Sequence, residues 1–450
     1  MALFLTARRT ANLKLQAVAA VASLVLALAL LQATSCGRRW PLRSLPASPA
    51  ASIGNPPSSI SWDHALFSQV QRDLQEFNHS GITLTHIEQA YCRGSRASIR
   101  VQVVEGRVYI AGETPSFQSR MSSIKRQLLG LWLAGGMPEG IDFVIEAEDG
   151  PTVGGTNEEC PSRGPLIGAA KVPSDPSHSH VVLAPDHTFA GWPEAHTLPW
   201  NEMLPLLQHA ALKQPWEQRS DLLFFRGAKT GTRYFLAPDL SSKYPDVLDV
   251  RVGRLRLLLL LFPQLSVSRG QGMTLAFFYA LPLRPLQLVD WSTAGFVSLT
   301  EHCRYKYLLH VPGNTYSGRL KYLLACGSAV VVSNSPWTEF WSHLARAGEH
   351  FMLADEVTGD NRGNQFANAT AVLQRDQGLA RRLGAAATQL VQDSLSPTMV
   401  QAYWRHLMHS YRSLQQYNAT LHADAVPLEL SILRAQVIDV SQRTCLKCKQ

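Results

Sequence analysis

Residues 310–332, HVPGNTYSGRLKYLLACGSAVVV, carry the clearest secondary-structure pattern in this 450-residue chain. The preceding segment 306–311, KYLLHV, is an apolar run of strand length, and residues 329–332 form a second one. The segment SGRLKYLLAC between them lies where a crossover helix belongs, so the stretch predicts a βαβ unit. Ser317 is placed to cap this helix, and Gly313 to form an unusual turn before it.

Positive charge stands where this helix begins. Arg319 falls in the first turn, where a cation is unfavourable against the helix dipole, and Lys321 follows it. An anion bound at the turn would reverse the sign of that penalty. The alternative is that both side chains are solvated surface charges.

A second basic loop follows another apolar strand. The segment 225–229, FRGAK, brings Arg226, Gly227 and Lys229 to the end of the strand DLLFFRG. Together with the turn around Ser317, this loop offers guanidinium, ammonium and backbone amide groups that suit a diphosphate. No D-x-D motif occurs in the sequence, so a carboxylate-bound metal has no obvious ligands. Ordinary surface charge is again the alternative.

Strands alternate with helices on both sides of about residue 201, which predicts two α/β domains with parallel sheets. Ligands of such sheets bind beyond the carboxyl ends of the strands. The predicted elements are helices near 63–77, 119–133, 202–212, 365–394 and 397–415, a hairpin around Glu105-Gly106, and strands at 141–149 and 221–227. Five leucines at 257–261 are predicted to form a buried element within an insertion.

Two further clusters belong to the first half. Asp149 follows the strand IDFVIEAED and is predicted to act as a general base, unless it only caps the Gly150-Pro151 turn. The segment 185–194, PDHTFAGWPE, offers Phe189 and Trp192 as a platform for a sugar or acceptor. Packing at the domain junction is the alternative for these aromatic residues.

The net charge of +8 comes mainly from the N-terminal region. Six of the 42 basic residues and none of the 34 acidic ones lie within residues 1–62, so the rest of the chain is close to neutral. This distribution gives no support for a nucleic-acid partner.

The uncharged segment 15–33, LQAVAAVASLVLALALLQA, is about long enough to span a bilayer and predicts a signal anchor. A cleaved signal peptide and a plastid transit peptide are the alternatives. A stem rich in Pro, Ser and Ala follows at 38–61. Sequons at Asn78, Asn368 and Asn418 favour the secretory lumen.

Seven cysteines are present, and in an oxidising lumen Cys303 is able to pair with Cys326. The pairing of Cys92, Cys160, Cys445 and Cys448 stays open. Cys445 and Cys448 lack two further zinc ligands at a compatible spacing.

CRYKYLLHVPGNTYSGRLKYLLACGSAVV resembles the signature of glycosyltransferase family 90, the protein O-glucosyltransferases and capsule-associated xylosyltransferases. The typical form runs C-K-Y-K-Y-L, then G, S-x-R-x-K and L-x-C-G-S. FFRGAKT is similar to the family's F-R-G-S-R-T, FVIEAEDGP to its strand ending in D-x-P, and PDHTFAGWPE to its P-D-x-x-F-x-G-W-x-E. The four blocks occur in the family's order over about residues 85–415.

The resemblance implies a GT-B architecture, in which two Rossmann-like domains face a cleft. The expected segments are 1–37 (cytosolic tail and signal anchor), 38–61 (stem), 62–201 (acceptor domain), 202–396 (UDP-sugar domain), 397–420 (a helix returning to the first domain) and 421–450 (tail). It also implies inverting transfer of glucose or xylose from a UDP-sugar to a protein or glycan hydroxyl, with no metal or other cofactor.

By position, the resemblance makes Asp149 the base, and Arg226, Gly227, Lys229, Gly313, Ser317 and Arg319 the UDP contacts. It also implies the Cys303–Cys326 disulfide. Lys229 stands where many relatives have arginine, and Gly150 replaces a bulkier residue. The usual ER-retrieval tail has no counterpart in Lys447-Cys448-Lys449-Gln450, so a single-pass type II protein of the Golgi is expected, with the ER lumen as the alternative.

Two rival functions stay open. One is β-xylosyl transfer to an N-glycan or polysaccharide, because nothing in the sequence separates UDP-xylose from UDP-glucose. The other is a non-catalytic lumenal glycan-binding protein that keeps the nucleotide loops as architecture.

Overall fold

The computed structural model describes residues 61, 63–93, 97–113, 117–151, 164–236, 240–258, 286–290, 295–354 and 364–434. The chain divides into Met1–Gly54 and Asn55–Gln450, and every described residue belongs to the second unit. The predicted anchor and nearly all of the stem lie outside the described residues. Within the described ranges, no helix has the length and apolar character needed to cross a bilayer.

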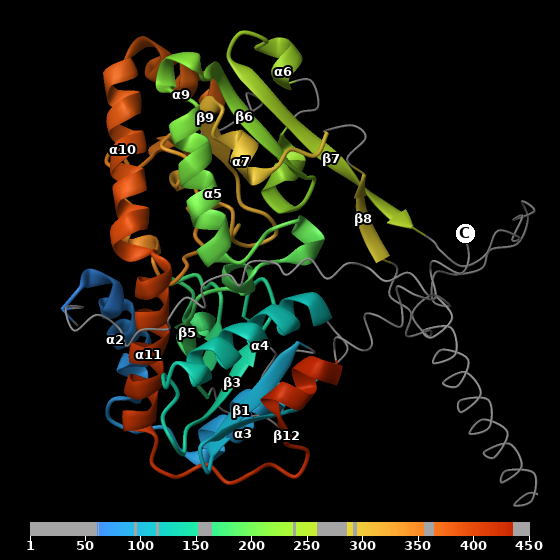
Figure 1. Ribbon diagram of the computed structural model, residues 1–450, viewed down its shortest axis with the longest axis vertical. Helices are drawn as coiled ribbons and strands as arrows, with labels where there is room; N and C mark the ends of the chain where they lie inside the picture. Colours follow the sequence, from blue (N-terminus) through green and yellow to red (C-terminus); the bar gives the residue numbers. More distant parts are fainter. Residues whose placement is uncertain are drawn as a thin grey trace, which may run out of the picture. The chain divides into compact units, whose positions relative to one another are not determined.

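Two six-stranded sheets organise the described chain (Figure 1). The first sheet has the order β12-β2-β1-β3-β4-β5, and the second has the order β11-β10-β9-β6-β7-β8. The strands of the first sheet are β1 (Ser98–Val104), β2 (Arg107–Ala111), β3 (Asp142–Glu146), β4 (Leu166–Gly168), β5 (Val181–Leu183) and β12 (Val426–Pro427). Those of the second are β6 (Ser220–Ala228), β7 (Leu248–Leu258), β8 (Leu286–Asp290), β9 (Tyr305–His310), β10 (Ala329–Ser333) and β11 (Met352–Ala354).

The helices lie around these sheets. They are α2 (Ser68–Leu74), α3 (Leu84–Arg93), α4 (Gln118–Leu133), α5 (Trp200–Lys213), α6 (Leu240–Lys243), α7 (Leu299–His302), α8 (Leu320–Leu324), α9 (Asn364–Arg375), α10 (Gln377–Ser394) and α11 (Pro397–Leu414). Short 3₁₀ turns include η4 (His187–Ala190) and η7 (Gly231–Phe235). The single helical stretch expected at 365–394 is two helices, because Asp376 ends α9 and caps α10 through Leu379 N.

The second sheet contains the predicted βαβ unit, β9-α8-β10, with β9 and β10 parallel. Its strands are buried on both faces: Phe225, Leu309 and Val331 pack into one apolar cluster, and their neighbours Phe224, Leu308 and Val330 pack into another. Two covered faces explain the continuous apolar runs in the sequence. Among the described strands of this second sheet, only the edge strand β8 runs antiparallel.

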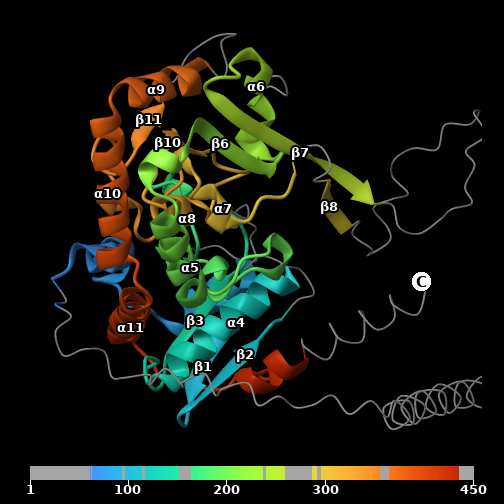
Figure 2. The same ribbon diagram turned by 45° about the horizontal axis from the view of Figure 1, so that its top comes forward.

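The parallel strands of this sheet have the order β7-β6-β9-β10-β11, so the chain order reverses between β6 and β9. A crevice outside the carboxyl ends of the strands at such a reversal is the usual ligand site of an open α/β sheet. Both basic loops found in the sequence leave the sheet at this point. Figure 2 labels β11, β10 and β6 in the upper part of the view, and β9 lies between β10 and β6 in the sheet.

The first sheet is mixed, so the prediction of two parallel sheets is wrong here. The β1–β2 hairpin turns at Glu105 and Gly106 as predicted, which makes β1 antiparallel to β2. The chain then crosses through α4 and adds β3 on the other side of β1, where it is antiparallel to β1. Only β3, β4 and β5 are parallel.

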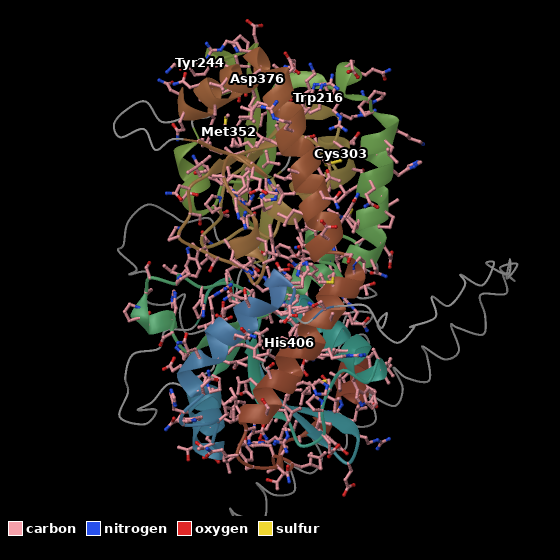
Figure 3. All side chains as sticks on the ribbon, turned by 90° about the vertical axis from the view of Figure 1, so that its left-hand side faces the viewer. Trp216, Tyr244, Cys303, Met352, Asp376 and His406 are labelled. Atoms are coloured by element: carbon pink, nitrogen blue, oxygen red, sulfur yellow. A yellow bond between two sulfur atoms is a disulfide. The ribbon has the colours of Figure 1, made fainter. Side chains whose placement is uncertain are left out.

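The C-terminal part of the chain returns to the first sheet. On α11, Tyr403 donates a hydrogen bond to Leu183 O at 2.9 Å, and Trp404 donates one to Gln127 Oε1 at 3.1 Å. His406 on the same helix contacts the ring of Phe67 (Figure 3). Beyond it, β12 pairs with β2 and residues 428–434 are helical, so the segment expected to be a tail adds structure to the first sheet. The domain limits drawn from the sequence stay predictions.

Candidate active site

A cavity of about 200 Å³ lies beside the carboxyl ends of β6 and β9. Its walls come from residues 188–197, from the loops after β6 and β9, and from residues 296–302 ahead of β9. Four residues singled out from the sequence line it: Trp192, Arg226, Ser317 and Arg319. The lining does not include the predicted residues Asp149, Phe189, Gly227, Lys229 and Gly313.

Two guanidinium groups meet in this cavity without an ion-pair partner among the described residues. Arg319 leaves Nη1 buried with no hydrogen-bond acceptor in the described chain. Arg233, from η7, donates to Ser317 Oγ at 3.0 Å and to Val311 O at 3.2 Å. Both are neutral acceptors, so neither guanidinium has a carboxylate within ion-pair distance in the described chain, although the charge of Asp149 acts on Arg233.

Burial and mutual repulsion act on these charges. Burial lowers the pKa of Arg319 to about 10. Burial, with Arg319 adding to it, lowers the pKa of Arg233 to about 9. Both groups stay protonated at neutral pH, and a buried pair of like charges favours a bound anion. Arg233 was not predicted, although it stands seven residues after Arg226 in the same strand-end loop.

Arg226 is paired within the protein, and its predicted contact with UDP stays a prediction. Its Nη2 lies 2.8 Å from both carboxylate oxygens of Asp249 on β7. Its Nη1 donates to Asp249 O at 2.8 Å and to Phe225 O at 2.9 Å. Only Nε remains, and it is buried without a partner in the described chain.

The predicted glycines shape the loops. At Gly227, a Cβ would lie 2.7 Å from the Phe225 ring and 3.3 Å from Arg319 Nη1, so the missing side chain lets Arg319 approach the strand. Gly313 has an ordinary φ, and the unusual conformation belongs to Gly231, with φ of +50°. A side chain at Gly231 would strike Gly313 O at 1.8 Å. The two loops therefore pack backbone to backbone.

One more prediction changes in this region, and one stays a prediction. Ser317 is not the N-cap of α8, because the helix starts at Leu320 and Arg319 holds the N-cap position. The Ser317 side chain instead accepts a hydrogen bond from Arg233. Lys229 follows β6, and its backbone N–H donates to Gly253 O at 3.0 Å. Its predicted contact with UDP stays a prediction.

Asp149 contacts residues from both halves of the chain. Its carboxylate is paired with Arg120 at 2.8 Å and is 41% exposed. Its backbone carbonyl accepts a 2.7 Å hydrogen bond from Thr315 Oγ1 in the loop after β9. The Arg120 guanidinium carbon also lies 5.3 Å from the centre of the Trp192 ring, which lines the cavity. Asp149 thus stands next to the cavity and remains accessible.

Phe189 and Lys321 are core residues. Phe189 packs against Trp200 and Phe340 and is 6% exposed, so packing, not a sugar platform, describes it. Lys321 is fully buried and bonds Thr188 Oγ1 and Asp186 Oδ1, the latter at 3.4 Å. Lys321 is therefore neither a solvated surface charge nor a free cation for an anion, so both interpretations from the sequence are wrong.

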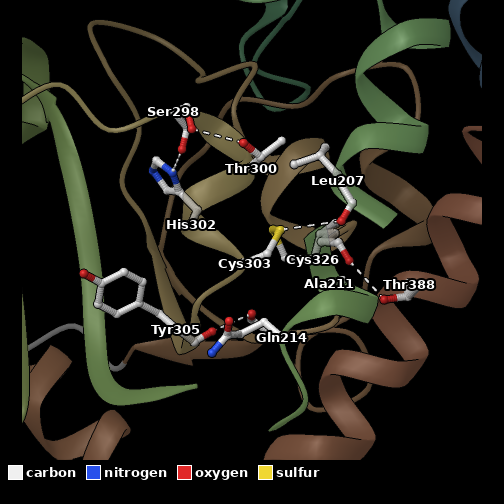
Figure 4. Close-up of a disulfide and its surroundings, with 12 residues drawn as sticks. Leu207, Ala211, Gln214, Ser298, Thr300, His302, Cys303, Tyr305, Cys326 and Thr388 are labelled. Carbon is white, nitrogen blue, oxygen red and sulfur yellow. Dashed lines mark hydrogen bonds between the residues drawn. A yellow bond between two sulfur atoms is a disulfide. The ribbon is translucent and has the colours of Figure 1, made fainter. Parts of the chain in front are cut away.

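His302 is a cavity residue that sequence reasoning missed. Its Nδ1 lies 2.8 Å from Ser298 O, and it directly precedes Cys303 (Figure 4). Cys303 forms a disulfide with Cys326, which confirms the pairing that the resemblance implies. The disulfide joins the residue after α7 to a residue after α8, so it links the chain segments that precede and follow β9.

The remaining predicted features lie apart from the cavity. Asn78, Asn368 and Asn418 are all exposed, but the Thr370 hydroxyl of the second sequon is buried and donates to Phe366 O within α9. Modification of Asn368 would therefore have to precede the folding of α9. In the described part of the chain, no group of three or more metal-ligating side chains is present.

Comparisons with known proteins point to one family. The family model described as glycosyl transferase family 90 matches residues 63–448. O-glucosyltransferase rumi of Drosophila pseudoobscura pseudoobscura is 25% identical over 354 residues, which are 77% of each chain. Human protein O-glucosyltransferase 1 is 24% identical over 359 residues, which are 78% of this chain and 80% of the relative.

A solved structure of Anabaena Alr3699/HepE in complex with UDP is also similar, at 9% identity. It covers 56% of this chain and 72% of that one, and its TM-score of 0.29 is too low to support a conclusion about fold. The match to the family model spans most of the chain and includes both basic strand-end loops and Asp149. This chain belongs to glycosyl transferase family 90.

Proposed function

We propose that this protein transfers glucose from UDP-glucose to a hydroxyl group of a protein or glycan, with inversion at the sugar and without a metal ion. The observation that carries the proposal is the meeting of Arg233 and Arg319, two cations without a carboxylate ion-pair partner in the described chain, at the carboxyl ends of β6 and β9. A diphosphate supplies the missing negative charge. The names of the relatives favour glucose over xylose as the donor sugar.

The proposed reaction is a single displacement. Asp149 accepts the proton of the acceptor hydroxyl, and the oxygen attacks the anomeric carbon from the face opposite the diphosphate. The bond from that carbon to the diphosphate oxygen breaks, and its electron pair leaves with UDP. Arg233 and Arg319 stabilise the charge that develops there, which is the role a metal ion has in other transferases.

We also propose the secretory lumen as the site of action, with the Golgi ahead of the ER, and a membrane anchor at residues 15–33. The Cys303–Cys326 disulfide supports an oxidising compartment. The exposed sequon residues Asn78 and Asn418 are consistent with it.

Substitution of the base tests the reaction. The full-length protein, in detergent, is incubated with UDP-glucose or UDP-xylose in the presence of EDTA, and released UDP and product mass are measured. Asp149→Asn should lower turnover about a hundredfold or more while leaving UDP affinity within a few-fold, because a general base acts on the chemical step.

Asp393→Asn, an exposed carboxylate on α10, is the matched control and should change neither quantity. Turnover of Asp149→Asn within a few-fold of the parent protein would refute the assignment of the base. A pentose in the product would show that the transferred sugar is xylose rather than glucose. Absence of both transfer and UDP-sugar hydrolysis would favour a non-catalytic glycan-binding protein.

A further inference from the structure

Arg120, on α4, contacts both carboxylate oxygens of Asp149. Its Nη1 lies 2.8 Å from Oδ1, and its Nη2 donates to Oδ2 at 3.3 Å. A planar guanidinium bound to both oxygens of a carboxylate fixes the orientation of that group as well as its position. The direction in which the Asp149 side chain points is therefore set by a residue 29 positions earlier in the chain.

The Arg120 side chain is itself held in place. Its Nη1 also donates to Ala147 O at 3.3 Å, two residues before Asp149. Its guanidinium carbon lies 4.7 Å from the centre of the Phe117 ring and 5.3 Å from the centre of the Trp192 ring. The Arg120 side chain is only 11% exposed, whereas that of Asp149 is 41% exposed. The buried cation therefore positions the accessible carboxylate.

The two elements that surround Arg120 are bonded to each other. Ser123, one turn further along α4, donates a hydrogen bond to Gly191 O at 2.5 Å, and Gly191 directly precedes Trp192. Trp192 also lines the cavity, whereas Arg120 does not. Arg120 thus contacts both a residue of the cavity wall and the carboxylate beside the cavity.

The backbone at Asp149 is held from the second half of the chain. Thr315 donates to Asp149 O at 2.7 Å, and a Cβ at Gly150 would lie 2.8 Å from the Trp337 ring. With the main chain packed in this way, Arg120 decides where the carboxylate lies. Orientation matters for a general base, because a misplacement of about 1 Å is able to lower the rate about a hundredfold.

An ordinary surface ion pair differs from this one. In the pair of Arg304 with Glu301, both side chains are about half exposed or more, and such pairs contribute little to stability. In the pair of Arg120 with Asp149, only the carboxylate is accessible. A carboxylate has about four acceptor positions, so two remain for a hydroxyl group after Arg120 has occupied two.

We propose that Arg120 is a positioning residue for sugar transfer, which holds the Asp149 carboxylate in the orientation that receives the proton of the acceptor hydroxyl. The inference rests on the proposed function, since Arg120 affects turnover in this way only if Asp149 is the base. The proton passes from the hydroxyl oxygen to a carboxylate oxygen of Asp149. Arg120 transfers no proton and contacts neither the sugar nor the diphosphate.

The separation of turnover from binding gives the first test. In the full-length protein, Arg120→Ala should lower kcat about thirtyfold or more and leave KM for the UDP-sugar and the affinity for UDP within about threefold. The matched control is Arg126→Ala, an exposed arginine on the same helix, which should change none of these quantities. Unchanged kcat in Arg120→Ala, or equal losses of kcat and UDP affinity, would overturn the proposal.

Arg120→Lys gives the second test and is the milder substitution for the fold, because it keeps the positive charge. An ammonium group makes one contact where the guanidinium makes two, so kcat should still fall about fivefold or more with UDP affinity unchanged. A kcat equal to that of the parent protein would show that the two contacts have no role in orienting the base.

The double variant Arg120→Ala with Asp149→Asn gives the third test. A residue that acts only through the base has no effect once the base is removed, so the double variant should have the turnover of Asp149→Asn within about threefold. Losses that multiply would mean that Arg120 acts independently of Asp149 and would contradict the proposal.

The same variants separate this inference from the proposed function. Turnover of Asp149→Asn close to that of the parent protein would refute the assignment of the base and, with it, the role of Arg120. A large loss in Asp149→Asn together with normal turnover in Arg120→Ala would refute only the positioning role.

Discussion

At the scale of single residues, the feature that needs explanation is uncompensated charge. Arg233 and Arg319 have pKa values below that of a free guanidinium, so the folded protein holds these protons less tightly than the unfolded chain does. The resulting penalty is complete at neutral pH and begins to be relieved only as the pH rises above about 9 to 10. Residues that destabilise the folded protein when no ligand is bound are typical of functional sites rather than of groups that stabilise the fold.

A buried acid gives a prediction of the opposite sign. Burial and the neighbouring Asp186 raise the pKa of Glu339 to about 8, while Lys321 opposes the shift. From about pH 4.5 to 8 the folded state keeps a proton that the unfolded state has lost, so this group lowers stability as the pH rises. Above pH 8 the cost is complete.

Glu339→Gln should therefore be more stable than the parent protein at pH 9, by about 2 kcal/mol or more, and of similar stability at pH 5. Urea unfolding at both pH values measures the difference. Glu349→Gln, an exposed carboxylate, is the control and should show no such change. A stability difference independent of pH would mean that Glu339 is ionised in the folded protein.

Single residues also show what sequence can and cannot reveal. Arg319 and Ser317 were predictable because a strand end and a charge pattern lie within a few positions of each other. The partners of Arg226 and Lys321 were not, because Asp249 and Asp186 lie 23 and 135 positions away and no local rule links them. Arg233 offered a signal, a second arginine in a glycine-containing loop after β6.

At the scale of elements, the correct predictions of helices and strands came from hydrophobic periodicity and from turn residues. The β1–β2 hairpin, α4, α5, β6 and the β9-α8-β10 unit all lie where apolar patterns and turns place them. The direction of β1 relative to β3 was mispredicted, because strand order depends on which side of the hairpin the α4 crossover reaches. That choice is made by packing between distant residues.

The disulfide around β9 gives a prediction at this scale. It joins residues separated by 23 positions, so removing it with the double substitution Cys303→Ser and Cys326→Ser should lower the free energy of unfolding by about 3 kcal/mol. Urea unfolding of both proteins, with and without reductant, measures the loss.

Reductant should destabilise the parent protein by the same amount and leave the double variant unchanged. The reduced parent protein keeps both thiols but lacks the bond, so its comparison with the double variant measures the loss of packing alone. A parent protein insensitive to reductant at its unfolding midpoint would show that the bond is absent or contributes nothing.

At the scale of the whole molecule, the two sheets supply different parts of one site. In the proposed site, the first half of the chain contributes Asp149 with Arg120, and the second contributes Arg233, Ser317 and Arg319. The contact from Thr315 to Asp149 O and the buried Lys321–Asp186 pair hold the loop after β9 against the first half. A sequence motif predicts the members of such a site, but only the folded chain shows which of them face the same cavity.

The most direct measurement is UDP affinity after loss of one unpaired arginine. Arg319→Ala should weaken UDP binding about a hundredfold, equivalent to about 2.7 kcal/mol, because a charged hydrogen-bonding group to the diphosphate is lost. Its thermal stability should not fall, since a buried unpaired charge is removed. Arg381→Ala, a half-exposed arginine on α10, is the control. If calorimetry shows Arg319→Ala binding UDP within threefold of the parent protein, the diphosphate is held elsewhere and the account is contradicted.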